Sequence, residues 1–508
     1  MFNLRGNQRT SGELSRKEGG KIFGSGSRTP ISITILVRKP NHTGSAAIHY
    51  EAVADYLSRE EKLALVSERG SMLSDKMSLS SIAPNEAGDW INQRDGLFET
   101  FIPISQSKKY DHKAQTFFVT DTNGIQTNRD SWVYNFSVEL LRRNVELSLR
   151  FYAAELKRFN DKHFANRKDA VADFINSDPR QFSWTRSTKG YVARNIEIPF
   201  CGEHFRIAQY RPFCKANLYF DKFYNEYPNQ LPKFFPTPQS KNLVICVPGV
   251  GTKKGFMPFI VDTIPDVQLQ FNGQCFPLYY YEKNDRDALS LFDNGKDEFV
   301  RRDAITDFIL QRAREEYGPR TTKEDVFYYV YGILHAKEYR ERFAADLQKS
   351  LPRLPLVEDT KTFRAFVSVG KKLAALHLNY ESIEPHPSVI VENDSAAPKV
   401  QQMRFGKSNG EEDKSIIHFN DAIRIINIPL RAYDWQVNGK SPIEWVMERY
   451  AVTVNRDSQI RNDPNEWCKE IEQPRYILEL IGRIVNVSIQ TLDLIAALPP
   501  LSFKTSAS

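Results

Sequence analysis

The sequence has 508 residues, of which 41% are hydrophobic and 12% aromatic, values typical of a globular protein with roughly two to four domains rather than a disordered chain. Residues 1–50 contain eight lysines and arginines and two acids, so this segment alone has a net charge of +6, which is the formal net charge of the whole chain. The remaining chain is neutral, so bulk charge supports phosphate contact only near the N-terminus. No apolar run could span a membrane and no signal peptide precedes the first residues, so we expect a cytoplasmic protein without a membrane partner.

The first predicted elements belong to an incomplete sheet. In chain order, the pattern predicts a strand over 2–5, a Gly/Ser/Arg-rich loop over 6–26 and a buried β-branched strand over 31–37. Ser58 and Glu61 have the spacing of a capping box, which predicts that a helix begins there. A polar stretch over 67–95 indicates a domain boundary. We therefore expect a domain over 1–95 whose first part lies outside this sequence.

A long amphipathic helix is expected after a short strand at 117–119. Its apolar side chains recur every three or four residues, at Val138, Leu141, Val145, Leu149, Tyr152, Leu156 and Phe159. The opposite side is mostly basic and carries Arg142, Arg143, Glu146, Arg150, Lys157 and Arg158. Two interpretations of this basic side stay open, because a charged face can be simply solvated or can face phosphate groups.

The remaining chain alternates strands and helices. The expected elements are a buried strand over 242–247, an aromatic strand over 275–281 with Pro277 at an edge position, a helical region that begins at a Thr321–Glu324 capping box and ends at Leu351–Pro352, an antiparallel meander over 402–405, 416–419 and 423–428, a helix that begins at Ser441–Glu444, and two apolar helices from about 475 to 497. The fold class is therefore α/β (mixed α+β), with a large second domain over 96–508 that divides into sub-units 96–320 and 321–508.

The sequence contains no complete active site, so we assign no catalytic and no metal-binding residue. A DNA adenine methyltransferase needs a Gly-rich cofactor loop and a polar-Pro-Pro-aromatic loop, and neither pattern occurs. The segment Gly249–Gly255 departs from a phosphate-binding loop because Phe256 replaces the lysine, and we interpret it as a basic turn between strands. Asp266 with Glu282-Lys283 only approaches the pattern of a metal-dependent nuclease.

Cysteines and histidines do not change this conclusion. The five cysteines have no metal-ligand or disulfide spacing, and we expect buried thiols. The nine histidines likewise lack metal-ligand spacing, and a structural role is favoured for His335. A polar and aromatic surface without a reaction centre is typical of a recognition module.

Several segments resemble one known family. Residues 3–10, 20–30 and 55–63 are similar to the closing part of the adenine methyltransferase domain in type ISP (type I single-polypeptide) restriction-modification enzymes. Seven later segments are similar to the C-terminal specificity domain of that family, and Asn128-Arg129-Asp130 lies in the first of them. These segments are 127–136, 210–213, 274–277, 328–335, 351–355, 438–445 and 462–465.

The resemblance implies a remnant of a methyltransferase sheet over 1–95 and a DNA target-recognition domain with several amphipathic helices over 96–508. Members of the family methylate adenine N6 and cleave DNA in an ATP-dependent reaction, with S-adenosylmethionine, ATP and Mg²⁺ as cofactors. None of these activities can be assigned to a residue here, so we expect no cofactor in this chain and no catalysis by it alone. The implied partners are double-stranded DNA and a chain that supplies the methyltransferase, helicase and nuclease parts.

Seven residues are the candidates for DNA contact under this hypothesis. Arg5, Arg9, Arg28, Lys253 and Lys254 are the first candidates for phosphate contacts, and Asn128 and Arg129 are weaker ones because their loop could be a structural turn. The residues that read bases cannot be named from one sequence. Two alternatives remain: a separate specificity subunit that docks on a methyltransferase and motor chain, and a complete but divergent DNA methyltransferase.

Overall fold

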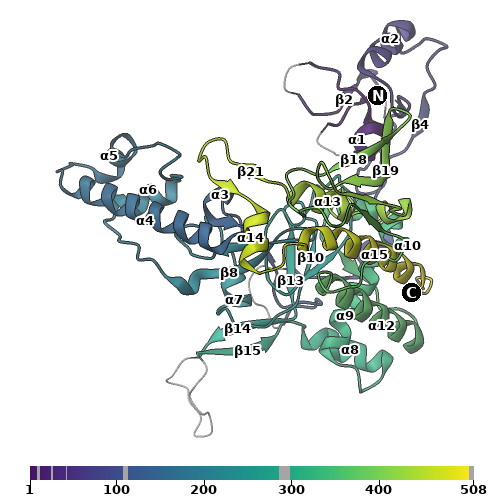
Figure 1. The fold of residues 1–508 in the computed structure, drawn as a ribbon. Helices are drawn as coiled ribbons and strands as arrows, with labels where there is room; N and C mark the ends of the chain where they lie inside the picture. Colours follow the sequence, from purple (N-terminus) through teal and green to yellow (C-terminus); the bar gives the residue numbers. More distant parts are fainter. Residues whose placement is uncertain (9–11, 25–26, 42, 107–112, 285–297, 503–508) are drawn as a thin grey trace.

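The computed structural model describes residues 1–8, 12–24, 27–41, 43–106, 113–284 and 298–502. Its mixture of helices and sheets agrees with the predicted α/β class. An N-terminal unit stands above a larger body in Figure 1, and a helical arm projects from the body to the left. Within the described ranges, no helix is both long and apolar enough to cross a membrane.

The N-terminal unit is a small four-stranded sheet with two helices. Its strands follow the order β2-β1-β3-β4, and its elements are β1 (Phe2–Arg5), α1 (Gly12–Glu18), β2 (Ile31–Ile33), β3 (Ile48–Ala52), α2 (Arg59–Arg69) and β4 (Ser80–Ile82). The strand predicted over 2–5 is confirmed, and it pairs antiparallel to β2 and parallel to β3. The capping box is confirmed as well, since Ser58 and Glu61 exchange both hydrogen bonds at the start of α2.

Two predictions for the N-terminal unit are wrong. The segment predicted as loop contains α1, and the ammonium group of the buried Lys62 holds the turn after this helix by donating to the carbonyls of Glu18 (2.6 Å) and Gly20 (2.9 Å). The strand predicted over 31–37 ends at Ile33, and Leu36 is 83% exposed. The reason is its position: β2 lies at the sheet edge and pairs with β1 alone among the described strands.

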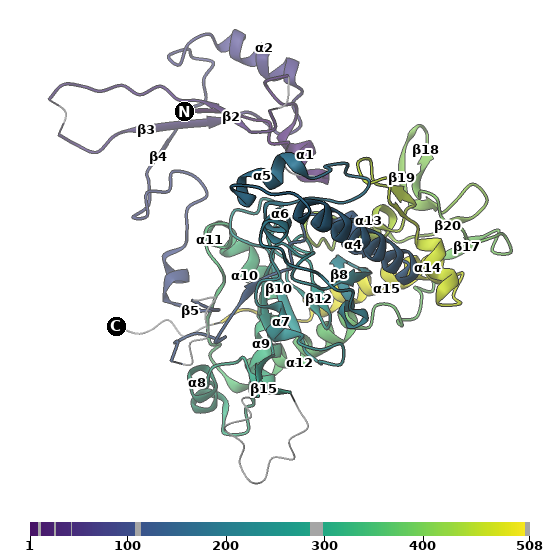
Figure 2. The same ribbon diagram turned by 90° about the vertical axis from the view of Figure 1, so that its left-hand side faces the viewer.

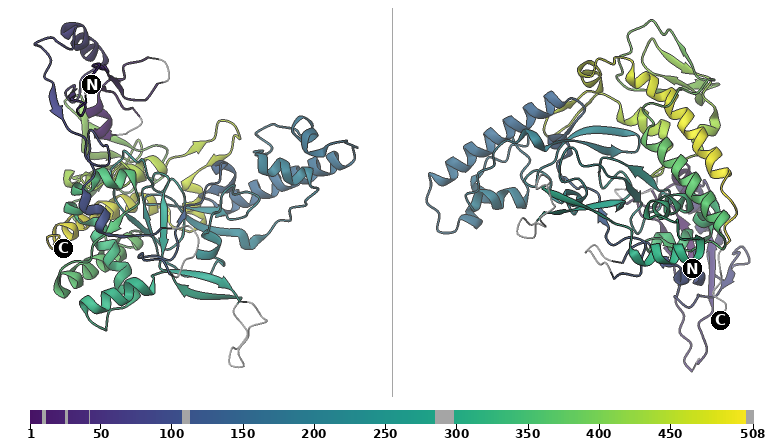
Figure 3. Two further views of the ribbon diagram at one scale, coloured as in Figure 1. Left: turned by 180° about the vertical axis from the view of Figure 1, so that it is seen from behind. Right: turned by 90° about the horizontal axis from the view of Figure 1, so that it is seen from below.

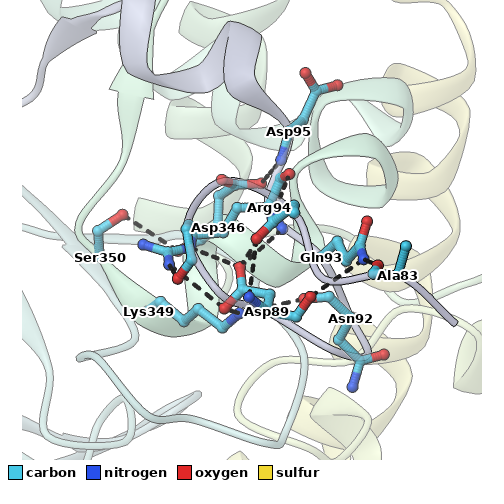
Figure 4. Close-up of polar contacts among 11 residues, drawn as sticks. Ala83, Asp89, Asn92, Gln93, Arg94, Asp95, Asp346, Lys349 and Ser350 are labelled. Atoms are coloured by element: carbon cyan, nitrogen blue, oxygen red, sulfur yellow. Dashed lines mark hydrogen bonds and ion pairs between the residues drawn. The ribbon is translucent and has the colours of Figure 1, made fainter. Parts of the chain in front are cut away.

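A polar connection joins the N-terminal unit to the body (Figure 4). The Asp89 carboxylate accepts a hydrogen bond from Arg94 (2.8 Å) and pairs with Lys349 of helix α11 (Ala344–Lys349; 2.7 Å). The Asp346 carboxylate of the same helix accepts from the Asp95 backbone N–H (3.1 Å). Arginine and lysine hydrogen bonds hold the pKa of Asp89 well below its usual range. The connection is therefore fixed to the body over 89–95.

The body contains two central sheets and one hydrophobic core. One sheet has the order β11-β10-β13-β6 and the other β12-β8-β9-β7, formed by β6 (Thr122–Asn123), β7 (Tyr134–Asn135), β8 (Phe205–Arg211), β9 (Cys214–Tyr219), β10 (Val244–Val247), β11 (Phe259–Val261), β12 (Ile264–Pro265) and β13 (Gln274–Pro277). A single cluster of buried apolar residues runs from Phe98 to Val487, so the suggested sub-units 96–320 and 321–508 share one core. The N-terminal unit has a separate small core around Phe2 and Leu4.

The remaining elements surround these sheets. They are η1 (Gly96–Thr100), β5 (Ile102–Pro103), α3 (Asp130–Val133), α4 (Val138–Asn160), α5 (Arg167–Phe174), α6 (Arg186–Ala193), η2 (Gly202–His204), α7 (Leu231–Phe234), β14 (Tyr279–Lys283), β15 (Phe299–Asp303), α8 (Asp307–Tyr317), α9 (Lys323–His335), α10 (Lys337–Arg342), α11 (Ala344–Lys349), β16 (Arg353–Leu354), α12 (Thr360–Leu378), β17 (Ile390–Glu392), β18 (Arg404–Ser408), β19 (Glu411–His418), β20 (Arg424–Ile426), η4 (Leu430–Tyr433), α13 (Pro442–Arg449), β21 (Thr453–Val454), β22 (Arg461–Asn462), α14 (Pro464–Glu470) and α15 (Tyr476–Ala496). The predicted meander is confirmed as β18, β19 and β20, and the helix start at Ser441 as the capping box of α13.

Helices α9 and α12 cross at two glycines. A methyl group on Gly370 would lie 2.0 Å from the Tyr328 carbonyl oxygen, and one on Gly332 would lie 2.4 Å from the Phe366 carbonyl oxygen. Both distances are far below van der Waals contact, so only glycine allows the two backbones to approach this closely.

Five further predictions are corrected by the structure. Residues 117–119 form only an isolated bridge at Phe118, and residues 275–281 divide into β13 and β14 in different sheets. Strand β13 is central rather than at an edge, which is possible because Pro277 lies beyond the two residues that pair with β6. The capping residue of α9 is Thr322, not Thr321, and the apolar segment at 475–497 is one helix, α15, rather than two.

Candidate nucleic-acid interface

The helical arm consists of α4, α5 and α6 and faces the viewer in Figure 2. The predicted periodicity of α4 is confirmed, because the side chains buried along it include Leu141, Val145, Leu149, Leu156 and Phe159. The Ser137 hydroxyl accepts a hydrogen bond from the Leu140 backbone N–H and caps the helix. On the basic side of α4, Arg143 and Arg150 are exposed, whereas Arg142 stacks on Phe205 and Arg158 pairs with Glu155.

The arm is locally positive although the formal charges of residues 51–508 sum to zero. Residues 138–195 contain twelve lysines and arginines and seven acids, a net charge of +5. A groove of about 1290 Å³ lies between α5 and α6 and is lined by the basic residues Arg167, Lys168, Arg186, Lys189 and Arg194, together with Trp184. Among the described residues, no carboxylate forms an ion pair with Lys168, Arg186 or Lys189. These side chains are therefore available to an anionic partner.

A short hairpin, β21–β22, stands beside the base of the arm. Its loop spans 455–460, and the Asn455 side chain organises it by accepting hydrogen bonds from the backbone N–H groups of Asp457 (3.1 Å) and Ser458 (2.9 Å). The buried Ser458 hydroxyl also contacts the Ser131 hydroxyl (3.2 Å). Arg456 and Gln459 are exposed at the tip.

Hydrogen bonds fix the hairpin to the start of α4. The Asn135 amide donates to the Arg461 carbonyl (3.1 Å), and the Phe136 backbone N–H donates to the Asn462 side chain (2.9 Å). Glu470 of α14 accepts hydrogen bonds from the Ser137 hydroxyl and the Val138 backbone N–H. The hairpin and the arm are therefore both held in place by hydrogen bonds at residues 135–138.

A hollow of about 380 Å³ separates the hairpin from α13 and β8 and is lined by Tyr210, Arg449 and Arg456 among others. Beneath it, the buried Asp266 pairs with Arg211 (2.8 Å) and accepts from the Tyr134 hydroxyl (3.0 Å). Burial raises the pKa of Asp266 to about 7, although Arg211 opposes this shift.

Basic side chains gather near the same place. Burial lowers the pKa of Lys254, and so do the charges of Arg211 and Arg449. Lys440 has a lowered pKa for the same reasons, with burial first and then Arg449 and Lys254. We call Lys254, Lys440 and Arg449 the basic cluster. Glu448 forms ion pairs with Lys440 and Arg449, so one carboxylate compensates part of the positive charge of the cluster and Lys254 adds the excess.

The predicted contact residues are dispersed over the molecule. Arg5 forms ion pairs with Asp55 and Glu18 inside the N-terminal unit, Arg28 is exposed there, and Arg9 lies outside the described residues. Lys253 is exposed on the turn between β10 and β11, and Lys254 is half-buried against Gly439. The structure does not bring these residues together, and their contact with DNA stays a prediction.

The side chains of Asn128 and Arg129 in the loop at 127–130 form hydrogen bonds within the protein. Asn128 has a positive φ of 58° and is exposed, and its side chain accepts a hydrogen bond from Gln126. The Arg129 side chain is only 1% exposed; it donates to the Thr185 hydroxyl (2.9 Å) and lies 3.6 Å from Glu226. Burial lowers the pKa of Arg129 to about 10. Arg129 thus connects α3 to α6, which agrees with the structural turn considered for this loop.

Sequence reasoning missed the groove on the arm and the hairpin. The zero sum over 51–508 conceals the charge of the arm, whereas a local count over 138–195 reveals its excess of basic residues. The hairpin has a weaker signal, the run of turn-forming polar residues from Asn455 to Ser458.

Comparison with known proteins places this architecture in a defined class. Residues 116–480 match the family model described as the Type ISP C-terminal specificity domain, so the body of the molecule is a specificity domain of this type. The chain belongs to the family of Type ISP restriction-modification enzymes. No curated relative matches the sequence.

Three solved structures are similar over 99% of this chain. A nuclease-deletion mutant of the Type ISP enzyme LlaGI in complex with a DNA substrate mimic shares 36% sequence identity with a TM-score of 0.84, and 44% of that chain is covered. The ATP-dependent Type ISP enzyme LlaBIII bound to DNA shares 32% identity with a TM-score of 0.82 and 31% coverage. The DrdV–DNA complex shares 25% identity with a TM-score of 0.80 and 48% coverage. The chain thus spans less than half the length of each relative.

Proposed function

We propose that this chain binds double-stranded DNA and recognises the target sequence as the C-terminal part of a Type ISP restriction-modification enzyme, acting in the cytoplasm. The observation that carries the proposal is the similarity over 99% of the chain to LlaGI and LlaBIII, whose structures were solved with DNA or a DNA mimic. The positive groove on the arm supports it, because basic side chains that neutralise phosphates supply most of the non-specific affinity for DNA.

We further propose that this chain binds none of the family's cofactors, and two observations support this. The segment Gly249–Gly255 joins the antiparallel strands β10 and β11, and no helix begins after it to direct backbone N–H groups at a phosphate. Among the described residues, no three His, Cys, Asp or Glu side chains are grouped as metal ligands. We propose that S-adenosylmethionine, ATP and Mg²⁺ are bound by other parts of such enzymes.

The proposal includes a chain segment that completes the N-terminal sheet. Its support is the apolar edge at β2, where Ile35, Leu36 and Val37 are 57%, 83% and 80% exposed. Three such side chains in a row are the kind of surface that a protein partner covers. The partner would supply the methyltransferase and motor parts, either in the same polypeptide or as a separate chain.

Salt-dependent binding tests the DNA-binding function. The full chain is titrated with duplex DNA of random sequence at several salt concentrations, next to a triple variant of the arm, Lys168→Ala, Arg186→Ala and Lys189→Ala. Each lost phosphate contact lowers the slope of log K against log [salt] by about 0.9, so the variant should lose roughly two to three units of slope.

A charge-matched control comes from the other side of the body, where α8 and α12 lie in Figure 1. The variant Arg312→Ala, Lys361→Ala, Lys372→Ala removes three exposed positive charges as well and should keep the original slope. Equal slopes for the arm variant and the control would refute a role of the arm, and absence of binding by the unchanged chain at low salt would refute the proposed function.

A further inference from the structure

Hydrogen bonds to Asn455 order the loop at the tip of the β21–β22 hairpin. The Asn455 side chain accepts from two backbone N–H groups of the loop, the Asn455 carbonyl accepts from the Gln459 N–H (2.9 Å), and the Asn455 N–H donates to the Ile460 carbonyl (2.9 Å). These bonds hold the backbone in place before any partner binds, which lowers the entropy cost of recognition.

The two exposed side chains at the tip have functional groups left for a partner. Among the described residues, no carboxylate pairs with Arg456, whereas Arg461 on the same hairpin pairs with Asp463 (2.7 Å). Gln459 uses one N–H to donate to the Arg456 carbonyl (2.6 Å), so the second N–H and the carbonyl oxygen of its amide remain.

The position of the hairpin fits contact with DNA. In Figure 1, and from behind in Figure 3 (left), it rises between the arm and the N-terminal unit. The hollow beside it contains Arg449 of the basic cluster and Arg456 itself. Because Arg449 and Arg456 line the same hollow, a DNA backbone that contacts Arg449 would lie beside the hairpin.

We infer that the β21–β22 hairpin enters the major groove of the target duplex and that Arg456 and Gln459 read base edges there. The inference rests on the proposed function. A two-stranded ribbon fits the major groove, where arginine pairs with guanine O6 and N7 and glutamine with adenine N6 and N7. The tip offers one residue of each kind, three positions apart, on a backbone that is already ordered.

Selection from a randomised duplex library tests the inference. The full chain, Arg456→Ala and Gln459→Ala each select bound sequences, and the affinity for the preferred site is then measured against a random duplex. Each variant should lose about 5- to 100-fold preference at one base pair while the other positions stay unchanged. Asn455→Ala leaves both readers in place but loosens the loop, and it should weaken the preference at both base pairs.

Arg461→Ala is the matched control, because it removes one positive charge from the same hairpin and should keep the sequence preference. If Arg456→Ala instead lowers the salt slope by about one unit at unchanged preference, Arg456 contacts phosphate and the inference is wrong. Unchanged preference in both tip variants also overturns it while DNA binding stands. If the unchanged chain binds no duplex at low salt, the proposed function fails first and the inference fails with it.

Discussion

Two buried histidines should make the body sensitive to mild acid. His335 and His377 are 0% and 1% exposed, their ring centroids lie 5.6 Å apart, and the His377 ring stacks on Trp435. His335 hydrogen-bonds to the Tyr331 carbonyl (2.8 Å), and His377 lies between the Tyr331 hydroxyl (2.6 Å) and the Thr491 hydroxyl (2.9 Å). The Thr491 hydroxyl donates to the Val487 carbonyl, so its oxygen accepts from Nε2 of a neutral His377.

The sign and size of the effect follow from the two pKa values. Burial lowers the pKa of His335 to about 3, and burial together with His335 lowers that of His377. A histidine in the unfolded chain has a pKa of about 6.5, so between pH 7.5 and 5.5 only the unfolded state takes up protons. The contribution of the two histidines to the free energy of unfolding is therefore fully present well above a pH of about 6.5. It falls by about 1.4 kcal/mol per histidine between pH 7.5 and 5.5, or about 2.7 kcal/mol for the pair.

Amide hydrogen exchange in α9 and α12 measures this loss, because it reports the free energy of opening these helices. The variant His335→Asn keeps a donor for the Tyr331 carbonyl and removes one titrating group, so its opening free energy should fall by about 1.4 kcal/mol less than that of the unchanged chain. Asp266, with its raised pKa of about 7, changes the free energy of unfolding with pH in the opposite direction, but it does so equally in both proteins. Identical pH dependence in the two proteins would refute the reasoning.

Two predictions concern packing and the connection between the units. Gly370→Ala should destabilise the body by about 1–3 kcal/mol, since its methyl group would overlap the Tyr328 carbonyl. The control Gly190→Ala in α6, where no atom lies within 4 Å, should be neutral or stabilising. Similar melting temperatures for both variants would contradict the close crossing of α9 and α12. Asp89→Asn removes the carboxylate that pairs with Arg94 and Lys349 and should speed protease cleavage within 83–95. Asp75→Asn on the N-terminal unit is the control and should leave the cleavage rate unchanged. Equal cleavage rates for the two variants would show that the ion pairs do not fix the connection.

Local patterns predicted those elements whose environment is determined by nearby residues. The seven-residue apolar stripe of α4 is one example, because a helix buries one face whatever covers it. The capping boxes at Ser58 and Ser441 are others, since both partners lie within one turn. Strand β10 was recognisable because it is buried on both faces and needs no alternation.

Elements that depend on distant partners were not predictable in the same way. The run at 31–37 has the composition of a buried strand, yet β2 is short and exposed because burial depends on which strands and layers meet it. Arg129 illustrates the converse: its neighbours in sequence are polar, but Thr185 and Glu226, which fold against it, enclose its guanidinium group. The single-residue shift of the α9 cap has a local cause, since Thr321 and Thr322 both have an acid three residues later and only Thr322 adopts the capping geometry.

The distribution of charge gives the candidate interface its physical basis. The formal charges sum to zero over 51–508, but residues 51–95 contribute five basic and nine acidic residues, so the body over 96–508 has a net charge of +4, and this excess lies on the arm. Screening at physiological salt acts over about 8 Å, so a phosphate near the arm responds to the +5 of residues 138–195 rather than to the sum over the domain. The arm can therefore attract the DNA backbone, while the hairpin, whose tip carries Arg456, Asp457 and Gln459, is nearly neutral and suited to discriminate between bases.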